Sequence, residues 1–187
     1  QTEAGIREVV DPSTLFRADR DSPVPGTCLT VAIQGRRPML VELQSLISPT
    51  TNPNPRRGVS GIESARVAMI IAVTERAASL RLFDKDVFVA TVGGIRLSDL
   101  ACDLAVALAI ASAGSDRTVP LDTAAIGEVT LSGDIRNVSM ANQRIAELAR
   151  LGYRRILAPP GVERTAERDP KVTIVEVRTL SHAIATV

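Results

Sequence analysis

The stretch Asp86–Gly114, DVFVATVGGIRLSDLACDLAVALAIASAG, constrains the fold more than any other part of the chain. Its first half carries β-branched and aromatic residues from Val87 to Val92 and then two glycines, which predicts a buried strand and a turn. Its second half is rich in alanine and leucine. With Ser98 as N-cap and Gly114 just past the end, it predicts a helix over Asp99–Ala113.

This helix is apolar on nearly every face, because Asp103 is the only charged residue from Leu100 to Ala113. Such a helix lies in the middle of a domain, covered by a sheet on one side and by other helices elsewhere. A lone buried carboxylate costs several kcal/mol unless it is paired. We therefore expect Asp103 to be a structural buried charge, with Arg96, Arg136 or free backbone N–H groups as its partner near the start of the helix.

Composition indicates one globular domain with an appended arm. The 187 residues are 45% hydrophobic and 23% charged, and no apolar run is long enough to span a bilayer. The two cysteines, Cys28 and Cys102, lie in apolar contexts, which argues against a disulfide scaffold or a metal site and favours a reducing cytoplasm. The chain opens without a methionine or a signal peptide, so we expect a fragment of a longer protein.

The charged and aromatic residues restrict the kinds of partner. The net charge is +1, the lysines are Lys85 and Lys171 alone, and the other cations are arginines. Aromatic residues make up only 2% of the chain, which argues against a single-strand binder that stacks bases on aromatic rings. If the chain binds nucleic acid, contact between arginine and phosphate is the available mechanism.

The first half of the chain is predicted to form an arm, a hairpin and a loop. Turn residues and charges mark Gln1–Pro25 as the arm. Strands over Cys28–Ile33 and Met39–Ile47 flank a turn at Gln34–Pro38, whose tip carries two arginines. For Arg36 at this tip a solvated turn is favoured over a phosphate contact. Three prolines and no apolar residue predict a loop over Ser48–Gly58.

The remaining segments alternate between helices and strands and predict an α/β (α+β) domain that opens with an antiparallel hairpin. In chain order they are a helix opened by a capping box at Ser60–Glu63, a strand over Ile126–Leu131, a helix capped by Ser139 and ended by Gly152, strands over Arg154–Ala158 and Val172–Val177, and a terminal helix over Ser181–Val187. Between the last two strands, Val162–Asp169 is either a short helix or a loop.

Common catalytic motifs are missing from the sequence. It has no P-loop, no CxxC pair, no HExxH helix and no GxGxxG loop. The single histidine, His182, has no paired nucleophile and is interpreted as structural. Cys102 is close to a helix N-terminus, where a thiolate is favoured, but a small buried thiol is the default interpretation for a cysteine on an apolar helix.

Several blocks of sequence, in matching order, carry a family resemblance. They are GIREVVDPS, PVPGTCLTVAIQGRRPMLVELQSLI, DVFVATVGGIRLSDLACDLAVALAIAS and GEVTLSGDIRNVSMANQRIAELARLGYRRILAPP. Together, from about Gly5 onward, they resemble the C-terminal, Lon-protease-like domain of the bacterial RadA (Sms) DNA recombination proteins. The resemblance implies a mixed sheet with packed helices, of the ribosomal protein S5 domain 2-like type, over residues 26–187. Residues 1–25 would then be the linker from a RecA-like ATPase core.

The resemblance also bears on catalysis. Lon proteases use a Ser-Lys dyad, with the serine in a DGPSAG-type motif and the lysine in a TGE–PxGGxK-type motif. Matching the two motifs places Ala101 at the serine position and Asn142 at the lysine position. A methyl group cannot attack a carbonyl and an amide cannot act as a base, so the resemblance implies a domain that keeps the protease scaffold without its chemistry.

For function, the resemblance implies a domain that contributes duplex DNA binding and hexameric ring assembly to an ATP-dependent branch-migration motor. ATP, Mg and Zn would be bound only by the preceding parts of such a protein, and this domain would bind no cofactor or metal and no membrane. The candidate DNA contacts are arginines near strand ends, in loops and, for Arg66, on the helix that follows Ser60–Glu63: Arg37, Arg56, Arg57, Arg66, Arg96 and Arg136. The alternatives are an active Ser-Lys peptidase with an unrecognised dyad, and a structural oligomerisation scaffold whose arginines are all paired internally.

Overall fold

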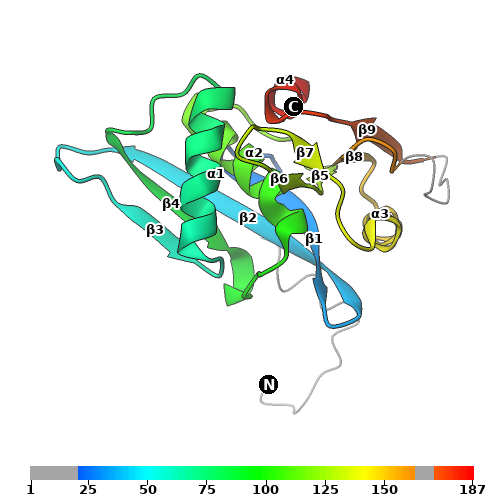
Figure 1. The fold of residues 1–187 in the computed structure, drawn as a ribbon. Coiled ribbons are helices and arrows are strands. Elements are labelled where there is room, and N and C mark those ends of the chain that lie inside the picture. Colours follow the sequence, from blue (N-terminus) through cyan, green and yellow to red (C-terminus); the bar gives the residue numbers. More distant parts are fainter. Residues whose placement is uncertain (1–20, 163–170) are drawn as a thin grey trace, which may run out of the picture.

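The fold is built on a seven-stranded mixed sheet in a computed structural model that describes residues 21–162 and 171–187 (Figure 1). In the order of the sheet the strands are β3 (Arg57–Ser60), β4 (Lys85–Thr91), β2 (Arg37–Pro49), β1 (Thr27–Gln34), β5 (Thr123–Ala125), β8 (Arg155–Ala158) and β9 (Thr173–Glu176). The pairs β1–β2 and β2–β4 are antiparallel and the other pairs are parallel. The predicted mixed α/β class is confirmed. Residues 1–20 of the predicted arm, residues 163–169 of the segment expected to be a helix or loop, and Pro170 lie outside the described residues.

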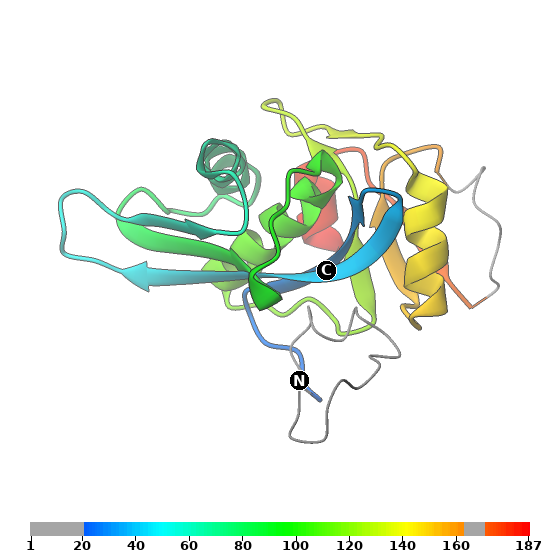
Figure 2. The same ribbon diagram turned by 90° about the horizontal axis from the view of Figure 1, so that it is seen from below.

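The helices cover the two faces of the sheet unequally. Helices α1 (Ser64–Ala77), α2 (Asp103–Ser115) and α4 (Leu180–Thr186) share one hydrophobic cluster on the first face. The short ribbon of β6 (Glu128–Val129) and β7 (Ile135–Arg136) adds Val129 and Ile135 to this cluster. On the second face, α3 (Ala141–Arg150) packs against β1 and the start of β2. Figure 2 shows α3 at the end of the sheet away from β3.

The predicted central helix is confirmed as α2, which is buried continuously from Asp103 to Ser112. Its two ends differ from the prediction. Asp99, rather than Ser98, caps a 3₁₀ turn that leads into the helix, because its carboxylate accepts the N–H of Ala101 at 3.0 Å. The helix ends at Asp116, which has left-handed backbone geometry.

Gly114 lies inside the last turn of α2 and does not end the helix. A Cβ at this position would come within 2.6 Å of Leu80 Cδ1. Close packing against Leu80 and Ile47, rather than the backbone of a helix cap, therefore explains the glycine.

Two predictions between the hairpin and α1 are wrong. The hairpin has the expected turn, with Gln34 paired to Arg37, but β2 continues to Pro49 and β3 begins at Arg57, so the expected loop is shorter. The capping box does not form. Ser60 ends β3 in parallel pairing with β4, and α1 starts after Glu63 without a side-chain cap.

Two predictions after α2 are also wrong. The expected strand over Ile126–Leu131 is broken at Gly127, which has φ of +157° and leaves no room for a Cβ beside Ile135. Ser139 does not cap α3; Met140 precedes the helix in left-handed geometry, and the Ser139 carbonyl instead accepts the Nε–H of Arg144. The last two strands and the terminal helix lie within about two residues of their expected ranges.

Candidate functional site

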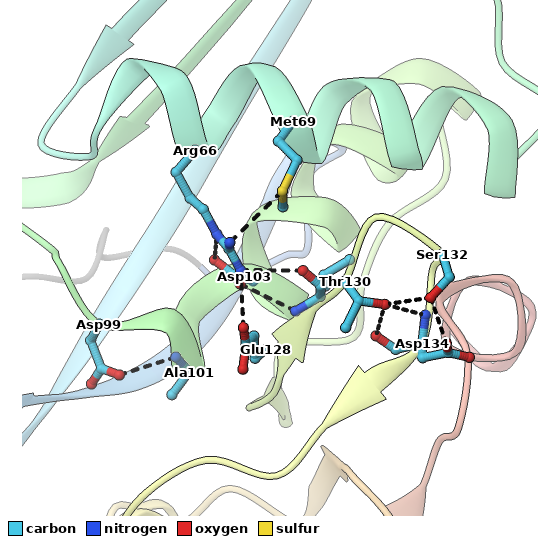
Figure 3. Close-up of polar contacts among 10 residues, drawn as sticks. Arg66, Met69, Asp99, Ala101, Asp103, Glu128, Thr130, Ser132 and Asp134 are labelled. Atoms are coloured by element: carbon cyan, nitrogen blue, oxygen red, sulfur yellow. Dashed lines mark hydrogen bonds and ion pairs between the residues drawn. The ribbon is translucent and has the colours of Figure 1, made fainter.

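Two carboxylates flank the start of α2, at the position that the resemblance assigns to a catalytic serine (Figure 3). Asp99 caps the 3₁₀ turn, and Asp103 lies one turn later in the first turn of α2. Negative charge is favoured at this end of a helix by the exposed N–H groups and the helix dipole. Each carboxylate also forms an ion pair with an arginine from another helix.

The first ion pair joins Asp103 to Arg66 of α1. The guanidinium donates from Nε to Oδ1 at 3.1 Å and from Nη2 to Oδ2, and the Val129 N–H also donates to Oδ2, at 3.2 Å. Figure 3 shows the Arg66 side chain reaching from α1 to Asp103. Asp103 is 3% exposed. The expectation that Arg96 or Arg136 pairs with Asp103 is wrong, because the arginine that pairs with Asp103 is Arg66.

Burial and the ion pair both shift the pKa values of Asp103 and Arg66. Burial raises the pKa of the Asp103 carboxyl above its ordinary value, and the hydrogen bonds from Arg66 and from the Val129 N–H oppose that rise. The hydrogen bond to Asp103 in turn raises the pKa of the Arg66 guanidinium. Arg66 also donates to the Val129 carbonyl at 3.2 Å and lies 3.8 Å from Glu128 Oε1. Its guanidinium is therefore committed to internal contacts.

The second ion pair joins Asp99 to Arg144 of α3, and sequence reasoning did not find it. Arg144 Nη1 donates to Asp99 Oδ2 at 2.7 Å and to the Val31 carbonyl at 2.7 Å. The Ile33 N–H donates to the same carboxylate oxygen at 2.9 Å. The Arg144 side chain is only 1% exposed. This cluster ties β1, the start of α2 and α3 together.

The two positions that the resemblance aligns with the Lon dyad, Ala101 and Asn142, lie on the elements that this second ion pair joins. Ala101 follows Asp99 in the 3₁₀ turn and is 1% exposed; Asn142 lies in the first turn of α3, two residues before Arg144. Ala101 offers only a methyl group and backbone atoms, and its carbonyl accepts the N–H of Gly127 at 2.9 Å. Lys85 is at the far end of β4 from the segment that leads to Ala101. The Cys102 thiol is buried, which raises its pKa and keeps it protonated.

Two of the six candidate DNA contacts are bound internally. Arg66 pairs with Asp103 as described. Arg57 donates to the backbone carbonyls of Lys85 at 2.6 Å and Leu82 at 2.9 Å, so it ties β3 to the loop before β4. Arg37, Arg56, Arg96 and Arg136 are exposed, and within residues 21–162 and 171–187 none of their side chains forms an ion pair.

The exposed arginines do not form one surface. The Gln34 side chain donates to the Arg96 carbonyl at 3.1 Å, which holds the segment carrying Arg96 beside the hairpin tip that carries Arg36 and Arg37. Arg57, next to Arg56, is level with Ile47 across β4, ten positions along β2 from Arg37. At ~3.3 Å per residue this separation is about 33 Å. Arg136 lies on β7, in the separate two-stranded sheet.

Within the described ranges, no three His, Cys, Asp or Glu side chains are grouped so that they could hold a metal ion. None of the helices in the described part is long and apolar enough to cross a membrane.

Comparison with known proteins relates most of the chain to one family. Residues 84–161 match the family model for subunit ChlI of Mg-chelatase, which is compatible with an α/β fold. The DNA repair protein RadA of Mycolicibacterium smegmatis is 51% identical over 158 residues, covering 84% of this chain and 34% of the relative. The protein of the same name from Mycobacterium tuberculosis is 47% identical over 156 residues, covering 83% of this chain and 32% of the relative. Its Escherichia coli counterpart is 39% identical over 185 residues, covering 98% of this chain and 40% of the relative.

The chain thus spans between about a third and two fifths of the length of these curated relatives. Identities of this size over most of the chain establish common descent. The chain belongs to the RadA family of DNA repair proteins and corresponds to one segment of its members.

Proposed function

We propose that the chain is the non-catalytic, Lon-like domain of a RadA protein and that it acts in DNA repair and homologous recombination. It contributes duplex DNA binding and hexameric ring assembly to an ATP-dependent branch-migration motor in the cytoplasm. ATP, Mg and Zn are bound by other parts of the protein. The relatives named as DNA repair proteins support the cellular role, and the distribution of arginines supports the DNA contact.

The observation that carries the DNA contact is the group of Arg36, Arg37 and Arg96, which we call the tip cluster. All three side chains are exposed, and the Gln34–Arg96 hydrogen bond keeps their segments together. Arginine binds phosphate oxygens through paired N–H groups, and such contacts carry no sequence information. One subunit offers few contacts, whereas a ring repeats them around a single duplex.

We expect duplex binding to weaken steeply with salt, with a log–log slope of roughly −0.9 for each phosphate neutralised. Arg96→Ala should make the slope shallower by about one unit for each phosphate that the variant no longer neutralises. The double variant with Arg37→Ala and Arg96→Ala should have a shallower slope than the single variant. Fluorescence anisotropy with two unrelated duplexes measures the slope and tests for independence of sequence.

The matched control is Arg81→Ala. The Arg81 side chain is 70% exposed and pairs with Asp84. It is next to Leu82, whose carbonyl binds Arg57, so it lies at the end of the sheet away from the tip cluster. The substitution therefore removes one surface charge without changing the tip cluster. Arg136→Ala tests the β7 position separately. Slopes that are equal for wild type, Arg96→Ala and the double variant would rule out the tip cluster, and an absence of duplex binding would favour the purely structural scaffold.

We expect no peptidase activity above background, because Ala101 and Asn142 occupy the dyad positions and the Cys102 thiol is buried and protonated. Hydrolysis of fluorescent casein, with a serine protease as positive control, measures this directly. Turnover by this chain that disappears when one of its serines is replaced would support the Ser-Lys peptidase alternative instead.

A further inference from the structure

The end of the β1–β2 hairpin is a tight, exposed turn. Gly35 and Arg36 form the turn between the paired residues Gln34 and Arg37. Gly35 has φ of +64°, which the first position of such a two-residue turn requires and which glycine adopts at no steric cost. Among the described residues, no atom lies within 4 Å of where its Cβ would be, so the turn is clear of other packing on that side. Figure 1 shows this end of the hairpin extending below α3.

Only a short part of the hairpin extends from the fold. The Ile33 N–H donates to Asp99 Oδ2 at 2.9 Å. The Val31 carbonyl accepts a hydrogen bond from Arg144 Nη1 at 2.7 Å. These contacts hold β1 against α3 and the start of α2 as far as Ile33. Residues 34–37 are therefore the part that a large partner meets first.

This part is too short to place two strands deep in a DNA groove. A two-stranded ribbon fits the major groove, which is about 12 Å wide and about 8.5 Å deep. At ~3.3 Å per residue that depth takes about two and a half residues of each strand. Here one residue of each strand and the turn extend beyond the contacts at Ile33. Contacts inside a groove therefore have to come from side chains of the turn.

We propose that the Arg36 side chain enters the minor groove of duplex DNA, an inference that rests on the duplex binding proposed above. Arg36 is exposed at the apex of the turn. A single guanidinium suits the minor groove, because that groove is only about 6 Å wide and its negative potential is enhanced where it is narrow. In the wider major groove a lone side chain meets one wall at a time.

The other two arginines of the tip cluster flank this apex. Arg37 is paired with Gln34 across the hairpin, and the Gln34 side chain donates to the Arg96 carbonyl at 3.1 Å. Within the described ranges no carboxylate forms an ion pair with any arginine of the tip cluster. Phosphates of both DNA strands border the minor groove, so Arg37 and Arg96 are placed to contact them while Arg36 lies between the walls.

The minor-groove position predicts which property of the duplex matters. The amino group of guanine at N2 is in the minor groove, and runs of A·T pairs have the narrower groove. Affinity should therefore depend on that amino group and not on the order of the bases. Unrelated duplexes of equal base composition are still expected to bind equally.

Base analogues that change only the minor groove test the proposal. Hypoxanthine in place of guanine removes the amino group, and 2,6-diaminopurine in place of adenine adds one, while the major-groove edges keep their donors and acceptors. Fluorescence anisotropy with the full 187-residue chain measures the affinities. We expect hypoxanthine to strengthen binding about fivefold and diaminopurine to weaken it by a similar factor.

Substitutions of Arg36 separate groove insertion from simple charge. Arg36→Ala should abolish both analogue effects and make the salt slope shallower by about one unit. Arg36→Lys should keep the slope but lose most of the analogue effects, because an ammonium is more strongly hydrated than a guanidinium. Arg81→Ala, the control away from the tip cluster, should leave the slope and both effects unchanged.

The possible outcomes distinguish this proposal from the duplex binding on which it rests. Equal affinities of the wild type for normal and substituted duplexes, with a steep salt slope, would overturn the minor-groove position and leave duplex binding in place. Analogue effects that persist in Arg36→Ala would assign the groove contact to another residue and would also overturn the proposal. An absence of binding to every duplex would overturn both.

Discussion

Asp99→Ala is expected to lower the free energy of unfolding by about 3–5 kcal/mol. The change leaves the guanidinium of Arg144, which is 1% exposed, without its counter-ion. It also removes the N-cap of the turn into α2 and the acceptor for the Ile33 N–H. Urea unfolding followed by circular dichroism measures the change.

Two further variants separate the causes of that destabilisation. Asp99→Asn keeps an oxygen that can accept the Ala101 N–H but removes the charge, so it should fall between wild type and Asp99→Ala. Arg81→Ala breaks the exposed Arg81–Asp84 pair and should cost at most about 1 kcal/mol. A destabilisation by Asp99→Ala as small as that by Arg81→Ala would show that the buried pair does not stabilise the fold.

Arg66→Ala is expected to cost about 3 kcal/mol, because it leaves the Asp103 carboxylate buried with only the Val129 N–H as a donor from the described residues. Arg66→Lys should recover part of this stability, since a lysine restores the charge but not the two-point contact. Adding Asp103→Asn to Arg66→Ala removes the uncompensated charge and should also recover part of it.

The destabilisation caused by Arg66→Ala should depend on pH. Without the guanidinium, burial raises the pKa of Asp103 further above its value in the unfolded chain. The folded variant then binds a proton more tightly than the unfolded variant, so its stability falls as pH rises through that range. The difference from wild type should therefore be smaller near about pH 5 than near about pH 8, and a difference independent of pH would contradict this account.

Local sequence patterns predicted the longer elements of the fold. The apolar run from Leu100 to Ala113 predicted the buried helix α2, because a helix without a polar face has to be enclosed. Turn residues between two alternating runs predicted the β1–β2 hairpin. Helical spacing predicted α1 and the stripe of Ile145 and Leu148 on α3. Each of these signals lies within a short window of sequence.

Helix ends and short strands were predicted less well, since contacts from elsewhere compete with local preferences. Ser98 and Ser139 are good N-cap residues, yet Asp99 caps the turn before α2 and Met140 precedes α3. Gly114 resembles a helix-ending glycine but is needed for packing against Leu80. The short strand β3 follows a proline-rich loop and forms because β4 offers it a parallel edge.

The sequence by itself determined the fold class, the central helix and the family resemblance. Only the tertiary structure decided which arginines are available to a partner. Arg66 is 37 residues from Asp103 and Arg144 is 45 residues from Asp99, and no local pattern relates such positions. From sequence alone an arginine is assigned to the surface. Its burial becomes favourable only when a carboxylate or carbonyl from elsewhere in the sequence lies beside the guanidinium in the fold. The fold brought those acceptors to Arg57, Arg66 and Arg144, and left Arg37 and Arg96 exposed at the hairpin tip.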